Sequence, residues 1–136
     1  MTALHDLPAQ DLLAAYRQRT LSPVEVTQAV LAHMERWEPH IRATYLLRPE
    51  HTLAQARQSE ARWQRSEPQG LLDGVPVTIK ENIATQGDPT PLGTAAVPLV
   101  PAAADAPPAA RLREAGAVMV AKTTMPDYGM LSSGLS

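Results

Sequence analysis

Apolar residues recur at helical spacing through the first half of the chain. Leu12, Leu13 and Tyr16 follow Pro8 and predict a short amphipathic helix over residues 8–18. A longer apolar stripe follows residue 22, and another lies within residues 51–65, so each segment is expected to be a helix with one face in the core. The stripe residues are Val26, Val30, Met34 and Trp37 in the second helix, and Leu53, Ala56, Glu60 and Trp63 in the third.

The second helix has clear start and stop signals. Ser22-Pro23-Val24-Glu25 places serine at the N-cap, proline at the first helical position and glutamate at the third, which is the pattern of a capping box. Pro39 is expected to end this helix, because proline interrupts helical hydrogen bonding. Between the second and third helices, the ATYLL stretch at residues 43–47 predicts a short strand.

The second half of the chain has the pattern of strands. Residues 75–79 and 117–122 are apolar and β-branched, while residues 84–104 are rich in Gly, Pro, Thr and Ala and predict a long loop. Before the second strand, Asp105 can cap a helix that has two prolines in its first turn, and Gly116 can close that helix. The order strand, loop, helix, strand favours two parallel strands with a right-handed crossover.

We therefore expect an α/β fold in which N-terminal helices are followed by a β-α-β unit. Ligands of open α/β sheets bind beyond the carboxyl ends of the strands. Lys80 and Lys122 both stand at such ends, directly after an apolar strand segment. The two lysines are therefore the first candidates for chemistry.

Composition narrows the classes of function. The chain has 136 residues, a net charge of −2 with both signs interleaved, and no cysteine. The charge gives no basic surface for nucleic acid. The lack of cysteine removes disulfides and thiolate metal sites and fits a reducing compartment, so a cytoplasmic location is expected. Residues 1–20 have no apolar run typical of a signal peptide or membrane span.

Cofactor and metal sites are not predicted by the pattern. The four histidines lack metal-ligand spacing, and neither glycine-containing stretch, GLLDG or GDPTPLG, follows a strand and opens a helix as a phosphate cradle requires. We therefore expect no cofactor, no metal, no nucleic acid and no membrane as partners.

Two interpretations of Lys80 follow from the residues alone. Lysine is almost never fully buried, so Lys80 can be a hydrated surface charge, or an ion-pair partner of Glu81 beside it. Alternatively, burial lowers its pKa and makes the neutral amine a general base. The pattern does not choose between these interpretations, nor between Lys80 and Lys122.

Two spaced blocks of the sequence resemble the amidase signature family. The family element G-V-P-[VI]-x-[VI]-K-[DE]-N is matched by residues 74–82, GVPVTIKEN. The family segment D-A-x-x-[AV]-x-x-L-[RK]-x-A-G-A, followed by a strand and K-T-x-[ML]-P-[DE]-[FY], is matched by DAPPAARLREAGAVMVAKTTMPDY at residues 105–128. The likeness runs from the capped helix near residue 22 to the end of the chain.

The resemblance implies an enzyme that hydrolyses carboxylic amide C–N bonds with a serine nucleophile, a second serine in a cis peptide bond and a lysine. It implies that Lys80 is the base, acting through the cis serine, and that Lys122 is a structural, hydrogen-bonding lysine. It also places Tyr128, Gly129 and Met130 in the acyl pocket, although a local turn with a buried methionine explains them equally well. The implied substrate is a small-molecule amide, and the implied fold is the mixed-sheet α/β fold of the family.

The family's G-G-S-S-G-G element, which carries both serines and the oxyanion hole, does not occur in residues 1–136. Ser132-Ser133-Gly134 lacks the leading glycines and comes too soon after Met125-Pro126-Asp127, so it better matches the loop before that element. We therefore expect residues 1–136 to be the N-terminal part of one amidase signature domain, incomplete at the C-terminus. Residues 1–69 are expected to be mainly helical and residues 70–136 to carry the lysine block.

Other functions remain open on the sequence alone. The chain on its own is expected to be inactive, since it lacks the serine element. A non-enzymatic remnant or interaction module is the first alternative, and association as a homo-oligomer through an exposed sheet edge is possible. A fragment of the glutaminase-type A subunit of a tRNA-dependent amidotransferase is the second, although Pro126-Asp127-Tyr128 departs from the M-D-E-F string of those proteins. A Schiff base on Lys80 has no supporting motif.

Overall fold

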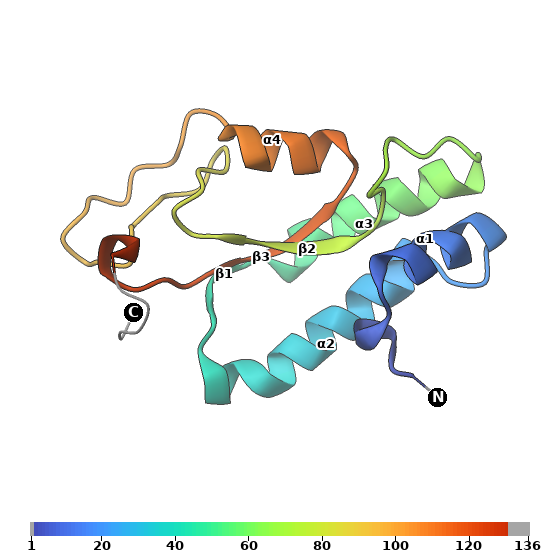
Figure 1. Cartoon of the computed structure of the whole chain (residues 1–136), viewed down its shortest axis with the longest axis horizontal. Coiled ribbons are helices and arrows are strands. Elements are labelled where there is room, and N and C mark those ends of the chain that lie inside the picture. Colours follow the sequence, from blue (N-terminus) through green and yellow to red (C-terminus); the bar gives the residue numbers. More distant parts are fainter. Residues whose placement is uncertain (1, 131–136) are drawn as a thin grey trace.

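The computed structural model of the chain describes residues 2–130. Figure 1 shows the strands lying between α4 on one side and α1 and α2 on the other. The helices and strands, in chain order, are η1 (Leu4–Asp6), α1 (Ala9–Gln18), α2 (Pro23–Ile41), β1 (Thr44–Leu47), α3 (Pro49–Gln64), β2 (Pro76–Lys80), α4 (Pro107–Glu114), β3 (Val118–Thr123) and η2 (Asp127–Gly129). The predicted helices and strands are all present.

The three strands form one mixed sheet in the order β1-β3-β2. β2 pairs with β3 in parallel and β1 pairs with β3 antiparallel. This arrangement confirms the expected α/β class, the parallel pair and the mixed sheet. Among residues 2–130, β3 is the central strand and β1 and β2 lie at the edges of the sheet. Association of two chains through such an edge remains a prediction.

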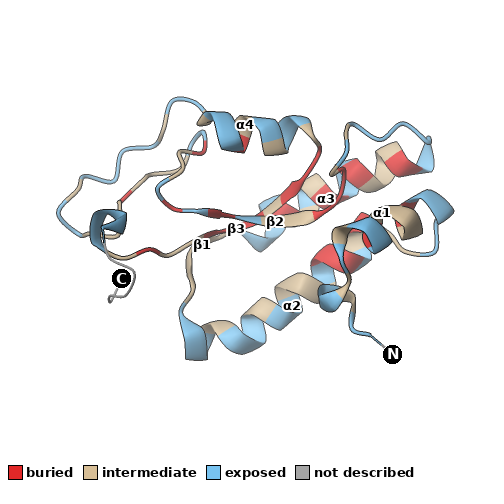
Figure 2. Ribbon diagram, in the orientation of Figure 1, coloured by how far each residue is buried: buried red, intermediate tan, exposed pale blue. Residues whose placement is uncertain are grey.

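The helical half packs around one apolar cluster. Leu12, Tyr16, Val26 and Trp63 are buried together between α1, α2 and α3. Figure 2 shows the buried residues of these helices on the sides that face one another and the sheet, with exposed residues outside. The amphipathic patterns of the first half therefore correspond to real packing faces, over part of their length.

The capping box of α2 is present as predicted. The Ser22 side chain accepts a hydrogen bond from the Glu25 backbone amide at 3.2 Å, and the Glu25 carboxylate accepts one from the Ser22 amide at 2.8 Å. The two bonds satisfy amides that have no partner inside the helix. They fix where α2 begins.

The predicted end of α2 at Pro39 is wrong. The helix continues to Ile41, and its C-cap is Arg42, which has φ 47° and donates its backbone amide to the Glu38 carbonyl. Pro39 lies in the last turn, where its missing amide removes a single hydrogen bond. Trp37 and Ile41 are 42% and 61% exposed, so the apolar stripe leaves the core before the helix ends.

The buried face of α3 also differs from the prediction. Thr52, Ala56, Ser59 and Trp63 are buried, whereas Leu53 and Glu60 are only half-buried. Thr52 donates its hydroxyl hydrogen to the Met119 carbonyl at 3.2 Å. A short polar side chain therefore packs against β3 at a position that the pattern of apolar residues did not mark.

Asp105 is not the N-cap of α4, contrary to expectation. That position is Ala106, which makes no side-chain capping bond. The Asp105 carboxylate instead accepts the Gln86 backbone amide at 2.7 Å and the Arg113 Nε at 2.7 Å. It thus ties the long loop to α4. Gly116, with φ 84°, closes the helix as predicted, and its amide donates to the Arg113 carbonyl.

None of the helices within residues 2–130 combines the length and apolar character needed to cross a bilayer.

Candidate active site at the carboxyl ends of the parallel strands

Lys80 is the last residue of β2 and Lys122 the penultimate residue of β3. In the parallel pair, Lys80 is opposite Thr123 and Lys122 is opposite Ile79. Successive side chains of a strand point to opposite faces of a sheet. The two lysines are therefore neighbours in the sheet but project from opposite faces.

Lys80 is exposed and Lys122 is buried. Among residues 2–130, Lys80 takes part in no ion pair, so the possible pairing with Glu81 is not formed. Glu81 instead donates its backbone amide to the Thr123 carbonyl at 2.9 Å, and its side chain is buried. The amine of Lys80 is therefore accessible to a partner group at the end of β2.

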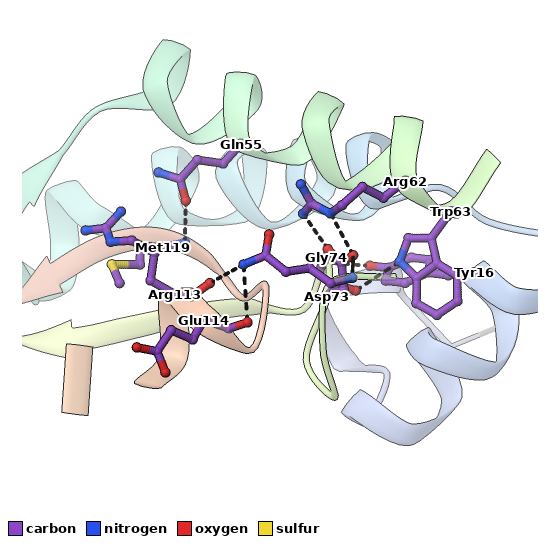
Figure 3. Close-up of polar contacts among 10 residues, drawn as sticks. Tyr16, Gln55, Arg62, Trp63, Asp73, Gly74, Arg113, Glu114 and Met119 are labelled. Atoms are coloured by element: carbon purple, nitrogen blue, oxygen red, sulfur yellow. Dashed lines mark hydrogen bonds and ion pairs between the residues drawn. The ribbon is translucent and has the colours of Figure 1, made fainter. Parts of the chain in front are cut away.

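The turn before β2 is held by side chains of α1 and α3. The Tyr16 hydroxyl donates to the Gly74 carbonyl at 3.2 Å, and the Trp63 indole N–H donates to the Asp73 carbonyl at 3.1 Å. Figure 3 shows these side chains converging on the Asp73–Gly74 turn. Gly74 has φ 84°, and an added Cβ would lie 2.7 Å from the Ser59 Oγ. The position therefore requires glycine, as the GVP block provides.

Asp73 and Arg62 make the buried ion pair of this turn. Arg62 donates its Nε to Asp73 Oδ2 at 2.9 Å and its Nη2 to Oδ1 at 2.6 Å, and the Gln69 amide donates to Oδ2 at 2.7 Å. Burial by itself raises the pKa of Asp73, but the bonds from Arg62 and Gln69 together hold that pKa below its usual value. The sequence pattern did not mark Asp73, because an acid next to a glycine is also typical of a plain turn.

Lys122 lies in a buried polar region on the other face. It is 4% exposed, and its Nζ has no hydrogen-bond partner within the described part of the chain. Its expected role as a hydrogen-bonding lysine is therefore not met there. Burial lowers the pKa of Lys122, and the nearby carboxylates of Asp88 and Glu81 only partly oppose this effect.

A pocket of about 300 Å³ adjoins Lys122 between α3, α4 and the sheet. Leu46, Ile79 and Lys122, which are register partners across the three strands, all line it. Lys80, Tyr128, Gly129 and Met130 do not line it. The pocket and the predicted catalytic lysine are thus on different faces of the sheet.

The predicted acyl-pocket residues lie in and just after η2. Tyr128 donates its backbone amide to the Leu92 carbonyl at 2.7 Å and has φ 50°. Tyr128 and Met130 are 54% and 82% exposed, while the buried methionine of this segment is Met125, at 2%. Met130 is therefore not a buried anchor, whereas Met125 is buried next to the turn at Asp127–Gly129, and the substrate-binding role remains a prediction.

Two further expectations concern serines and metals. Ser132 and Ser133 lie outside the described residues. Within residues 2–130, no group of three or more His, Asp or Glu side chains is arranged to hold a metal ion.

Comparisons with known proteins place this geometry in a family. The family model described as Amidase matches residues 25–136. The chain is 38% identical over 133 residues to the A subunit of the glutamyl-tRNA(Gln) amidotransferase of Chloroflexus aurantiacus, a match that covers 98% of this chain and 27% of that protein. The chain therefore spans about a quarter of the length of this relative.

Solved structures give the same result. The peptide amidase of Stenotrophomonas maltophilia is 28% identical, with a TM-score of 0.82 over 90% of this chain and 26% of that structure. A bacterial aryl acylamidase of the amidase signature family has a TM-score of 0.83 over 93% of this chain and 27% of that structure, at 22% identity, which shows the fold alone. With the family model matching most of its length, the chain belongs to the amidase family, whose signature enzymes share its fold.

Proposed function

We propose that the protein carrying this chain hydrolyses carboxylic amide C–N bonds by a Ser/cis-Ser/Lys mechanism in which Lys80 is the base. The observation that carries the proposal is the placement of Lys80 within the GVPVTIKEN block. It ends an edge strand, its side chain is exposed, and the turn before its strand is anchored by Asp73 and Gly74. Family membership supports the same assignment.

The chemistry requires a base because a serine hydroxyl is a weak nucleophile until a neighbour accepts its proton. In the proposed reaction, the amine of Lys80 receives that proton through the cis serine. The serine oxygen attacks the amide carbon, and the amine leaves with a proton. Water then hydrolyses the acyl-enzyme ester. Tyr128, Gly129 and Met130, exposed at η2, are proposed to contact the acyl group of a small-molecule amide.

Residues 1–136 contain no G-G-S-S-G-G element to supply the nucleophile and the oxyanion hole. One oxyanion donor is worth roughly 10²–10³ in turnover, and the nucleophile more. We therefore expect the 136-residue chain by itself not to hydrolyse amides. A clean preparation of this chain whose amide turnover disappears on Lys80→Ala would contradict that expectation.

The test begins with the intact mass of the protein from its own source. A mass well above 14.7 kDa gives a longer protein in which Lys80→Ala can be assayed, and we expect it to lose at least about 10³ in kcat. Lys122→Met is the matched control, since it removes the only other lysine in residues 1–136 from the opposite face of the sheet. Equal losses in the two variants would contradict the assignment of Lys80.

A second candidate is the role of the A subunit in a tRNA-dependent amidotransferase. It is favoured by similarity to several such proteins, including the mitochondrial one of Aedes aegypti, which is 35% identical over 124 residues. Pro126-Asp127-Tyr128 departs from the string expected of these proteins. Glutaminase activity that depends on co-purifying partner proteins would favour this role, and turnover of simple amides by the isolated protein would favour the amidase. A well-behaved monomer of 14.7 kDa without turnover would instead favour a non-enzymatic module.

A further inference from the structure

The pocket beside Lys122 contains a buried amine that the proposed hydrolysis does not use. Lys122 is 4% exposed, and its Nζ has no hydrogen-bond partner among residues 2–130. An unpaired polar group is costly to bury, and an ammonium group more so. Because the side chain lines a pocket of about 300 Å³, a ligand in that pocket can reach it.

The mouth of this pocket is open and carries two arginines, each paired with a carboxylate. His51, Gln86 and Arg113 are exposed, and the Arg48 side chain is half exposed. Arg48 is 2.7 Å from Asp88 Oδ1, and Arg113 is 2.7 Å from Asp105. A guanidinium group has five N–H donors, so both arginines keep donors for another acceptor.

More basic than acidic side chains line the pocket. Among the ionised side chains that line the pocket, Lys122, Arg48 and Arg113 are basic and Asp88 alone is acidic. Thr85 donates its hydroxyl hydrogen to Asp88 Oδ2 at 2.8 Å, and Arg48 balances the charge of Asp88 from 2.7 Å, although Oδ1 accepts no hydrogen bond among residues 2–130. Glu81, buried next to this region, opposes the positive charge from behind the pocket lining.

We propose that this pocket binds the carboxylate group of a small organic acid, with Lys122 Nζ as the buried donor and Arg48 and Arg113 at the mouth. The site is on the face of the sheet opposite Lys80, so it does not depend on amide hydrolysis.

The pKa of Lys122 should differ between the empty and the occupied pocket. Burial lowers the pKa of Lys122 in the empty pocket despite Asp88 and Glu81. A carboxylate oxygen next to Nζ stabilises the ammonium form and raises that pKa. Between the two pKa values, binding therefore takes up a proton, and affinity falls as the pH rises through this window. The titratable and charged groups around Lys122 on the neighbouring elements are Tyr45, Arg48, His51, Glu81, Asp88 and Arg113.

The test uses the full 136-residue chain labelled with [ε-¹³C]lysine. Only two lysine signals exist, and Lys122→Met assigns them. We expect sodium acetate to move the titration midpoint of the Lys122 signal upward and saturably, while the Lys80 signal stays unchanged. A shift of about one pH unit corresponds to a tenfold preference of acetate for the ammonium form. Sodium chloride at equal ionic strength and neutral acetamide are the controls.

A second variant separates binding in the pocket from binding elsewhere. Gln86→Trp places a large side chain at the exposed mouth and leaves Lys122 in place, so the acetate response should be lost while the circular dichroism spectrum is kept. The proposal is overturned if chloride or acetamide reproduces the acetate shift, if both lysines respond equally, if neither responds, or if Gln86→Trp responds like the parent chain.

Discussion

Loss of the Asp73 carboxylate should destabilise the fold far more than loss of an exposed acid nearby. Asp73→Ala leaves three donor groups without an acceptor: the Nε and Nη2 of Arg62, and the backbone amide of Gln69. The carboxylate is fully buried and the Arg62 side chain is 21% exposed. Breaking a buried pair costs about 3–5 kcal/mol, and water can reach part of Arg62, so we expect about 3 kcal/mol.

The assay is urea unfolding followed by far-ultraviolet circular dichroism, because Trp63 touches the mutated turn and its fluorescence would change directly. With a slope of about 2 kcal/mol per M urea, the midpoint should fall by about 1.5 M. The matched control is Glu67→Ala. Its pair with Arg65, at 3.1 Å, is 59% and 70% exposed, and such pairs contribute at most about 1 kcal/mol.

A double-mutant cycle isolates the pair itself. In an Arg62→Met background the guanidinium is absent, so Asp73→Ala should destabilise less than it does in the parent chain, with a coupling energy of about 2 kcal/mol. If Asp73→Ala and Glu67→Ala shift the midpoint equally, or if the coupling is below about 0.5 kcal/mol, then the buried pair does not hold the turn before Lys80.

Three other outcomes follow from the same contacts. The folded-state pKa of Asp73 is below its unfolded value of about 3.9, so the stabilisation from its carboxylate is present above that pH and is lost as the pH falls through the folded pKa. The urea midpoints of the parent chain and Asp73→Asn should therefore converge in acid, and a constant gap between them contradicts this. Gly74→Ala should lower the free energy of unfolding by about 1–3 kcal/mol more than Gly87→Ala does. Both glycines have positive φ, but of the two only Gly74 has atoms within 3 Å of the new Cβ. Equal losses of unfolding free energy in urea would leave backbone strain as the sole cause. Ser22→Ala should lower the free energy of unfolding by about 1 kcal/mol through loss of the capping bond, as thermal unfolding can measure, and an unchanged melting temperature would mean that the box adds nothing.

The sequence alone predicted the order of the helices and strands and the family, because the signals for both are local. Capping at Ser22, closure at Gly116 and the apolar strand segments depend on residues a few positions apart, so they can be recognised without the fold. The GVPVTIKEN block likewise identifies Lys80 as a residue of interest, because the match is contiguous.

Contacts between distant residues were decided only by the tertiary structure. Asp105 looks like a cap locally, but it bonds with Gln86 and Arg113, which lie 19 and 8 residues away. Asp73 pairs with Arg62 because the fold brings α3 close to the turn before β2. Such partners leave no mark in the spacing of apolar residues.

Lys80 and Lys122 also show what the sequence predicted and what the tertiary structure decided. Each follows an apolar strand segment, so the sequence alone presents them as equivalent. In the fold, β3 lies between β1 and β2, and Lys122 faces the side that α3 and α4 cover, whereas Lys80 ends an edge strand and faces the opposite side. Lys80 and Lys122 are offset by one residue in the pairing of β2 with β3, so their side chains point to opposite faces of the sheet. One amine is therefore buried and the other exposed.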